Sequence, residues 1–322
     1  MIKSNKVITI AIPTYNRAKK VERLLRDLHK TLIDENLYEN VCILVSDNNS
    51  EDNTESLIKC IDFGQIDFQY YKQERNLGFD QNVLFLYEAA NSDYVWLFSD
   101  DDIPLPGAIL KIFNFIFSHK NDIILFSFMQ PPGSNIRQFN YSKLINVITD
   151  PKLIIKDVIK MPKLSIYVLK KYKFSNEERQ ILSNSIGDGW MFIMLSFSIL
   201  DKSINPSLVI FSEQLAMSDD EYHKIWVPTP FLWLYKIALH PFVKKHSPDL
   251  ENQLREDGYR QCIIFSWALI TGKLTLDDKD GLINFIKNLD WRLKFLLKNP
   301  KLLLMMLLMK SKLLNYKFYK VV

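Results

Sequence analysis

The sequence is short of long apolar runs, and this shortage excludes whole classes of protein. Its longest uncharged apolar run, Leu302–Met309, has eight residues, whereas a helix that crosses a bilayer needs about 20. The apolar segment Val7–Ile12 is likewise shorter than the core of a secretory signal peptide. We therefore expect neither a transmembrane helix nor a signal peptide, and we expect a cytoplasmic location.

Cysteine and glycine are also scarce. The three cysteines, Cys42, Cys60 and Cys262, are dispersed and form no Cys-x-x-Cys pair, so we expect buried, reduced thiols and no zinc site. Only 9 of the 322 residues are glycine and 13 are proline, while 48% are apolar and 24% are charged. This composition excludes a collagen-like, low-complexity or disordered chain and leaves room for one large globular domain or two smaller ones.

Acidic residues are absent from one stretch of the sequence. Residues 291–322 contain eight lysines and arginines and no aspartate or glutamate, which leaves 33 basic against 37 acidic residues elsewhere. A basic, apolar segment of this kind is typical of a helix that lies on an anionic membrane surface. The alternative is a core helix whose lysines reach out to water. The acidic clusters elsewhere and the lack of a nucleic-acid-binding motif argue against a nucleic-acid partner.

The sequence alternates between expected strands and expected helices. Five segments have the composition of buried strands: Val7–Ile12 closed by Pro13, Val41–Val45, Phe68–Tyr71, Tyr94–Phe98 and Asp122–Phe128. Helices are expected between them: after Asn16 as the cap, over Thr54–Ile61, over Asn82–Ala90 and after Pro106. This alternation predicts an α/β fold with a mostly parallel, doubly wound sheet.

The pattern is weaker beyond the fifth strand. A helix is expected over Met191–Leu200, a strand over Leu208–Phe211, and a mostly helical region from Pro230 onward. Residues 134–165 show no clear pattern. We therefore expect two halves of one α/β domain, 1–128 and 129–229, followed by a helical C-terminal region, 230–322.

Polar clusters follow three of the expected strands. They are Thr14–Asn16, Ser46–Ser50 and Ser99–Asp102. Ligands of parallel α/β sheets bind at the carboxyl ends of the strands, which all lie at one edge of the sheet. The three clusters therefore predict a binding site at this edge.

Asp100, Asp101 and Asp102 form an aspartate triplet, the strongest chemical signal of the sequence. Adjacent carboxylates repel one another unless solvent or a cation compensates. Mg²⁺ or Mn²⁺ takes oxygen ligands and shares them with phosphates, so a metal on a nucleotide diphosphate suits this position. The alternative is a solvated acidic turn that caps the next helix.

Two residues of the other clusters could contact a nucleotide. The carboxylate of Asp47 can accept a hydrogen bond from a base or a ribose hydroxyl, or it can form an Asx-turn before the helix near Thr54. Tyr15 can stack on a base or pack against the protein.

The ordered set of motifs resembles glycosyltransferase family 2. The motifs are Pro-Thr-Tyr-Asn-Arg after the first strand, Val-Ser-Asp-Asn-Asn-Ser after the second, Arg75 to Gly78 with Asn82, and Ser-Asp-Asp-Asp after the fourth. The resemblance covers residues 5–115 closely and continues weakly to about 230. It implies the GT-A fold, a Rossmann-like sheet flanked by helices. The Ser-Asp-Asp-Asp form and the Gly-Asp-Gly-Trp segment at 187–190 resemble the branch of abequosyltransferase-like enzymes of surface polysaccharide synthesis.

The resemblance implies roles for named residues. Pro13, Thr14, Tyr15 and Asn16 would line the nucleotide pocket, Asp47 would hold the base, and Arg75 or Asn76 would flank the diphosphate. The triplet would supply the metal ligand of a DxD motif. Because Ser99 stands where the commoner pattern has an aspartate, either Asp100 with Asp102, or Asp101, would be that ligand.

Asp188 is the candidate catalytic base. Inverting transfer needs a carboxylate that takes the proton of the acceptor hydroxyl, and family members commonly place it in an acidic-Trp motif before a helix. The alternative is a helix N-cap, with Trp190 in the core. His223, beside Asp219, Asp220 and Glu221, is either a further ligand or a solvated side chain.

Together these features predict a metal-dependent, inverting glycosyltransferase. It would move a sugar from a nucleotide-sugar donor to a saccharide, or lipid-linked saccharide, acceptor in bacterial surface glycan synthesis, at the cytoplasmic face of the membrane. The alternatives are a sugar-1-phosphate nucleotidyltransferase, which would favour a Gly-rich basic loop after the first strand, and a non-catalytic membrane-associated protein that binds nucleotide sugars.

Overall fold

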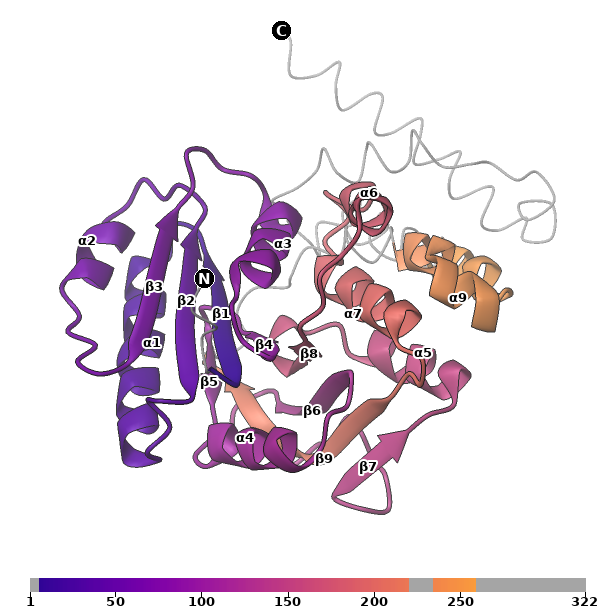
Figure 1. Ribbon diagram of the computed structural model, residues 1–322, viewed down its shortest axis with the longest axis horizontal. Helices are drawn as coiled ribbons and strands as arrows, with labels where there is room; N and C mark the ends of the chain where they lie inside the picture. The colour runs from indigo at the N-terminus through magenta and orange to yellow at the C-terminus, as the bar shows by residue number, and fades with distance from the viewer. Residues whose placement is uncertain (1–5, 220–233, 259–322) are drawn as a thin grey trace, which may run out of the picture. The chain divides into compact units, whose positions relative to one another are not determined.

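The computed structural model describes residues 6–219 and 234–258 (Figure 1). Two compact units share these residues: the first holds 6–219 and 240–248, and the second holds 234–239 and 249–258. Within the described residues, no helix combines the length and the apolar character needed to cross a membrane.

The first unit is built around one nine-stranded mixed sheet. The strands are β1 (Ile8–Thr14), β2 (Val41–Asp47), β3 (Asp67–Lys72), β4 (Tyr94–Leu97), β5 (Asp102–Pro104), β6 (Ile123–Met129), β7 (Ile145–Ile148), β8 (Val168–Lys170) and β9 (Leu208–Ser218). Their order is β3-β2-β1-β4-β8-β6-β9-β5, and β7 pairs with β9.

The helices of this unit connect or cover these strands. They are α1 (Ala18–Asp34), α2 (Thr54–Lys59), α3 (Phe79–Ala89), α4 (Ala108–Ser118), α5 (Pro151–Lys160), α6 (Asn176–Ser183), α7 (Met191–Lys202) and α9 (Pro241–His246), with a 3₁₀ turn, η1 (Leu164–Ile166). The buried residues of α1, which include Leu24, Leu28 and Leu32, are all apolar, as expected for the inner stripe of an amphipathic helix.

The first four strands are parallel, and their order reverses once. The chain passes from β1 to β2 and then β3 on one side of β1, and it returns to place β4 on the other side. Right-handed crossovers therefore put α1 and α3 on opposite faces of the sheet (Figure 1). The carboxyl ends of β1 and β4 flank the switch point, which is where ligands of open α/β sheets bind.

The second half of the sheet mixes directions. β8 runs antiparallel to β4 and β6, β9 runs parallel to β6, and β5 and β7 both run antiparallel to β9. The mostly parallel α/β sheet flanked by helices confirms the predicted fold class. The predicted boundaries within the chain, 1–128, 129–229 and 230–322, stay a prediction.

Three local expectations were wrong. β1 continues through Pro13 to Thr14, and proline is tolerated there because pairing with β4 ends at Ala11, which leaves that edge of β1 free. α3 begins at Phe79, three residues before the expected start, after Gly78 at a φ of 81°. Cys42 is buried as expected, but Cys60, at the end of α2, is exposed.

The second unit is described over a short length. It contains the 3₁₀ turn η2 (Leu234–Leu239) and a helix over 250–258. The guanidinium of Arg255 lies 3.9 Å from the ring centre of Tyr235 and pairs with Glu251 at 2.8 Å. The predicted basic tail at 291–322, Cys262, and the acidic run at Asp220 and Glu221 with His223 lie outside the described residues.

Candidate active site

The switch point of the sheet brings two of the predicted polar clusters into contact. Thr14, the last residue of β1, donates a hydrogen bond from its hydroxyl to Asp100 Oδ2 at 2.8 Å. Arg17 Nη1 lies 2.8 Å from Asp100 Oδ1 and 3.0 Å from Asp101 Oδ2. The carboxyl ends of β1 and β4 are thus joined by a threonine, an arginine and two aspartates.

The three carboxylates of the triplet have different partners. The Asp101 side chain is 25% exposed and accepts a hydrogen bond from Ser99 Oγ at 2.6 Å, whereas the Asp100 side chain is only 4% exposed. Asp102 is fully buried as the first residue of β5; it accepts from the Ser165 hydroxyl and lies 3.0 Å from Lys163 Nζ. Only Asp101 therefore offers a carboxylate with substantial exposed surface.

The electrostatics follow these environments. Burial raises the pKa of Asp100, although the nearby Arg17 charge opposes the shift, and burial raises the pKa of Asp102 to about 6 against the charge of Lys163. Burial also works against ionisation of Asp101, but the Ser99 hydrogen bond and the neighbouring cations outweigh it and lower the pKa of that carboxyl. The exposed member is thus the one held most firmly as a carboxylate.

A metal ion would have one accessible carboxylate here. Within residues 6–219 and 234–258, no three His, Cys, Asp or Glu side chains form a group that could hold a metal. Mg²⁺ and Mn²⁺ are nevertheless often held by one or two carboxylates together with substrate phosphates. The ionised, partly exposed carboxylate of Asp101 fits that second arrangement.

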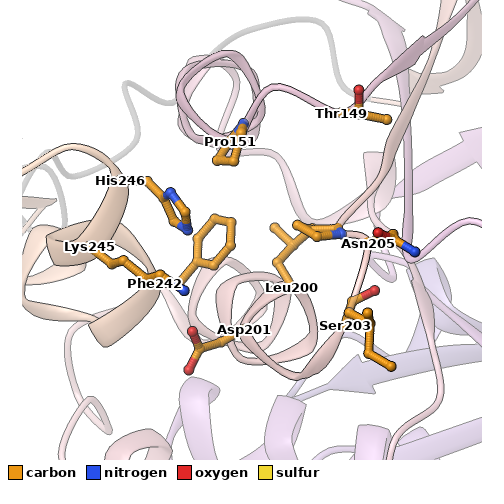
Figure 2. A pocket seen from close by; sticks show the side chains of 11 residues that line it. Thr149, Pro151, Leu200, Asp201, Ser203, Asn205, Phe242, Lys245 and His246 are labelled. Atoms are coloured by element: carbon orange, nitrogen blue, oxygen red, sulfur yellow. The ribbon is translucent and has the colours of Figure 1, made fainter.

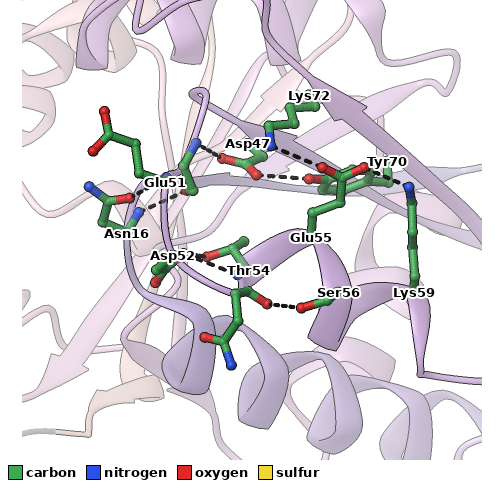
Figure 3. A network of polar contacts seen from close by, with 12 residues as sticks. Asn16, Asp47, Glu51, Asp52, Thr54, Glu55, Ser56, Lys59, Tyr70 and Lys72 are labelled. Atoms are coloured by element: carbon green, nitrogen blue, oxygen red, sulfur yellow. Dashed lines mark hydrogen bonds and ion pairs between the residues drawn. The ribbon is translucent and has the colours of Figure 1, made fainter.

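The loop after β2 is folded on the carboxylate of Asp47. This residue is fully buried, and it accepts hydrogen bonds from the Ser50 amide and the Tyr70 hydroxyl, both at 2.8 Å (Figure 3). The hydrogen bond from the Ser50 amide to the Asp47 carboxylate fits the predicted turn better than it fits a carboxylate left unpaired for a nucleotide. A direct contact from Asp47 to a nucleotide base stays a prediction.

The loop after β1 is tied to the loop after β2. Asn16 has a φ of 52° and does not cap α1, because the N-cap of that helix is Arg17. Instead, Asn16 Oδ1 accepts a hydrogen bond from the Glu51 amide at 2.8 Å (Figure 3). The Asn16 amide in turn donates to Ser50 Oγ at 2.8 Å. Tyr15, which lies between Thr14 and Asn16, is exposed, so its ring has an open face for stacking.

The predicted diphosphate residues lie before α3. Arg75 and Asn76 are both exposed. Asn76 Oδ1 accepts from Asn48 Nδ2 at 2.9 Å and from the Gly78 amide at 2.8 Å. Asn76 is thereby joined to the loop after β2, next to Asp47, whereas Arg75 is an exposed cation beside it.

Asp188 lies in the loop that precedes α7. The residue is buried, and Gly187 and Gly189 on either side have φ angles of 94° and 80°. The N-cap of α7 is Trp190 rather than Asp188, so the alternative interpretation of Asp188 as the helix cap was wrong, although Trp190 is buried as that interpretation expected.

A short series of contacts connects this loop to the end of β4. The rings of Trp190 and Tyr167 both pack against Phe192, at centroid distances of 6.1 and 4.9 Å. The Leu97 amide, at the end of β4, donates to the Tyr167 carbonyl at 3.1 Å. These contacts thus link the Asp188 loop to Leu97, which lies three residues before the aspartate triplet.

A separate pocket lies at the other end of α7. Residues from the start of α5, the end of α7, the segment that follows α7, and α9 line it, and apolar side chains among them include Leu200, Phe242 and Pro151 (Figure 2). A helix rises about 1.5 Å per residue, so the length of α7 separates this pocket from the Asp188 loop. None of the predicted site residues lines it.

Several residues of the site were not found from the sequence. Lys163 and Ser165 belong to the segment that shows no pattern, and only the folded chain brings them to Asp102. From the sequence alone, Asp80 is an ordinary acidic residue near the start of a helix, whereas in the structure it contacts the Asp188 loop. Arg17 stands inside the Pro-Thr-Tyr-Asn-Arg motif, and its place in that motif was the available signal.

The comparison with protein families matches this arrangement. Residues 9–203, which include both the switch point and Asp188, match the model of Glycosyl transferase family 2. The chain belongs to glycosyltransferase family 2. The predicted resemblance is therefore confirmed.

Two curated relatives support the assignment over part of their length. The chain is 36% identical over 100 residues to abequosyltransferase RfbV of Salmonella typhimurium, a match that covers 30% of this chain and 28% of RfbV. It is 25% identical over 142 residues to the uncharacterised glycosyltransferase MJ1057 of Methanocaldococcus jannaschii, which covers 42% of this chain and 47% of that protein. The chain thus matches less than half the length of either relative.

Solved structures show the same fold. A crystal structure of S. aureus TarS in complex with UDP-GlcNAc has a TM-score of 0.58 at 14% identity, covering 87% of this chain and 79% of that one. A TarS structure in complex with UDP has a TM-score of 0.56 at 15% identity, covering 88% and 81%. At this level of identity the likeness concerns the fold.

Proposed function

We propose that this protein is an inverting glycosyltransferase that moves a sugar from a nucleotide-sugar donor to a saccharide acceptor. The observation that carries the proposal is the contact of Thr14 and Arg17 with Asp100 and Asp101 at the switch point of the sheet. Membership of glycosyltransferase family 2 and the names of the two curated relatives support the reaction class.

The donor would bind over the carboxyl ends of β1 and β2. The exposed ring of Tyr15 would stack on the base, and Pro13, Thr14 and Asn16 would form the wall beneath it. Asp47 would shape this wall by holding Ser50 and Tyr70, and Arg75 and Asn76 would flank the diphosphate. The same fold in TarS, which was solved with UDP-GlcNAc, supports a nucleotide sugar as the donor.

A divalent cation would be held by Asp101 together with the donor phosphates. The carboxylate of Asp101 is the exposed, ionised member of the triplet, which supports this choice over Asp100 with Asp102. When bound, Mg²⁺ or Mn²⁺ would neutralise charge on the departing diphosphate. Asp100 and Asp102, held by Arg17 and Lys163, would keep the backbone of Asp101 in place.

Asp188 would act as the general base. The acceptor oxygen attacks C1 of the donor sugar, its proton passes to the Asp188 carboxylate, and the bond from C1 to the diphosphate breaks so that the nucleoside diphosphate leaves with the electron pair. The attack comes from the face opposite the leaving group, which inverts C1. The place of Asp188 close to Trp190, in the loop that precedes α7, supports this role.

The acceptor and the location are further parts of the proposal. The basic segment 291–322, which lies outside the described residues, supports attachment to an anionic membrane surface at the inner face of the cell membrane. Such a location would suit a lipid-linked saccharide of a bacterial surface glycan. Deletion of residues 299–322 is expected to shift the protein from the membrane fraction to the soluble fraction, and unchanged fractionation would refute the attachment.

A donor screen tests the function. UDP-, GDP-, CDP- and dTDP-linked sugars are added with and without Mn²⁺, and the melting temperature is recorded for the wild type and for Asp101→Asn. We expect one nucleotide to stabilise the wild type in the presence of Mn²⁺, with the shift lost in the variant. Absence of any nucleotide-dependent shift in the wild type would contradict the proposal.

A further inference from the structure

The carboxylate of Asp80 is surrounded by the backbone of the Asp188 loop. Asp80 Oδ2 accepts hydrogen bonds from the amides of Gly187 at 2.8 Å and Gly189 at 2.7 Å, and Oδ1 accepts from the amide of Met191 at 3.1 Å. These donors lie more than 100 residues away in the sequence. One buried side chain therefore holds three amides of a five-residue loop.

Asp80 has no charged partner that would explain its burial. It is 3% exposed, and among the described residues its surroundings contribute burial and backbone hydrogen bonds but no opposite charge. Burial raises its pKa, and the amides of Gly189, Met191 and Gly187 oppose the shift. A buried carboxylate is costly unless its hydrogen-bond capacity is satisfied, so the loop amides are what make the position tolerable.

The loop is shaped to receive a carboxylate. Gly187 and Gly189 have φ angles of 94° and 80°, in the left-handed region that favours glycine. Backbone amides in such a turn can point toward one site and form an anion-binding nest. Here the nest is filled by Asp80, and Asp188 stands between the two glycines.

The first turn of α3 is also anchored to the donor side of the site. Asn82 Nδ2 donates to the Ser46 carbonyl at 3.1 Å, and Asn76 Oδ1 accepts from Asn48 Nδ2. Ser46 and Asn48 flank Asp47 at the end of β2. Residues 76–82 thus contact the loop after β2 through two asparagines and the Asp188 loop through Asp80.

We propose that Asp80 is a positioning residue, which fixes the 187–191 loop so that Asp188 faces the acceptor hydroxyl at a set distance from the donor. The inference rests on the proposed role of Asp188 as the general base. Asp80 itself touches neither substrate. Asp80 holds the loop that carries the base in a fixed position relative to the donor half of the site.

Three variants separate positioning from folding. Asp80→Ala removes all three acceptor bonds, whereas Asp80→Asn keeps one carbonyl oxygen, which can accept from both Gly187 and Gly189. Glu88→Gln is the matched control, because Glu88 lies on the same helix but pairs with Arg179 at 3.0 Å, away from the loop. Each variant is first checked for a cooperative melt.

The readout is release of nucleoside diphosphate from the sugar nucleotide of the UDP, GDP, CDP and dTDP panel that the wild type turns over fastest with Mn²⁺. We expect Asp80→Ala to lower kcat by about 10–100-fold with the KM for the donor within about twofold, because a base misplaced by about 1 Å loses that much rate. Asp80→Asn should recover part of the loss, and Glu88→Gln should match the wild type. The acid limb of the pH profile should move in Asp80→Ala, which a mere loss of folded protein cannot cause.

The double variant Asp80→Ala with Asp188→Asn distinguishes the two levels of the proposal. If Asp80 acts through Asp188, the double variant is no slower than Asp188→Asn alone. Near-normal kcat in Asp188→Asn would overturn the proposed base and, with it, the role of Asp80. Loss of activity in Asp188→Asn with normal kcat in Asp80→Ala would overturn the positioning role only. Amide hydrogen exchange gives a reading without turnover: exchange at 187–191 should rise in Asp80→Ala but not in Glu88→Gln, and unchanged protection would also overturn it.

Discussion

His240 should make the stability of the first unit depend on pH. The ring is buried at the start of α9, its Nδ1 accepts a hydrogen bond from the Phe242 amide at 3.2 Å, and its Nε2 lies 3.0 Å from Ser198 Oγ on α7. Because Nδ1 accepts, the neutral ring carries its proton on Nε2 and donates to Ser198. Protonation of Nδ1 would break the bond to Phe242 and bury a charge.

Burial lowers the pKa of His240 from 6.5 to about 4. Between these values the unfolded chain binds a proton that the folded chain does not, so stability rises with pH across this window and the contribution is complete above pH 6.5. One pKa unit corresponds to about 1.4 kcal/mol, so the free energy of unfolding should fall by about 3 kcal/mol as the pH drops from 6.5 to 4.

The measurement is urea unfolding at a series of pH values from 7.5 to 4. His240→Asn keeps an acceptor for the Phe242 amide at the helix cap but cannot titrate, so the stability difference between wild type and variant should shrink by about 3 kcal/mol toward pH 4. Ser198→Ala keeps the histidine and should retain the pH dependence of the wild type. A stability difference between wild type and His240→Asn that stays constant with pH would show that His240 does not have a lowered pKa in the folded protein.

Three further outcomes follow from the same structure. Thr14→Val removes the hydroxyl that donates to the buried Asp100, and we expect a loss of about 1–3 kcal/mol in urea unfolding; an unchanged midpoint would count against that contact. Asp101→Asn should leave the melting temperature of the nucleotide-free protein within a few degrees of the wild type, since its side chain is partly exposed, and a large drop would show that the residue is mainly structural. Cys42 is buried and burial raises its pKa to about 12, whereas Cys60 is exposed, so a thiol reagent should label Cys60 in the folded protein; the Cys60→Ser variant should lose that fast reaction, and rapid labelling of Cys42 would contradict the burial.

The parallel half of the sheet could be predicted from the sequence because its signals are local. β1, β2 and β4 are fully buried strands that appear in the sequence as continuous apolar runs, and polar residues mark their ends. The polar ends of β1 and β4 were correctly expected to meet, because parallel strands share one carboxyl edge. The hydrogen bond from Thr14 to Asp100 confirms this expectation directly.

The antiparallel half could not be predicted, because its elements depend on distant partners. β5 has three residues, begins at Asp102 and exists only because it pairs with the end of β9. β9 itself extends past the expected end at Phe211. Its later part is polar and shifts register against β6, so the alternation of apolar and polar residues typical of a strand cannot be recognised in the sequence. The α5 helix did carry a signal, since Asp150 caps it and Pro151 occupies its first turn. The strand before it, β7, has only four residues, most of them not buried, so it gives no clear strand pattern from which to place the helix.

The candidate site divides in the same way. Residues at or just after the carboxyl end of a strand, such as Thr14 at the end of β1 and the aspartate triplet after β4, could be found from position alone. Lys163 and Asp80 could not, because a lysine in a loop and an aspartate in the first turn of a helix are ordinary surface residues in the sequence. Only the folded chain brings Lys163 to Asp102 and buries Asp80 against the loop of Asp188.

The central claim is that Asp188 takes the acceptor proton at a donor site built on the ends of β1 and β4. The most direct test is the turnover of Asp188→Asn under saturating donor and Mn²⁺, measured beside the donor dissociation constant of the same variant. We expect a loss of kcat of about 10²–10⁴-fold with donor affinity unchanged, because a general base contributes about that much to the rate and does not bind the nucleotide. Near-normal turnover in this variant would contradict it.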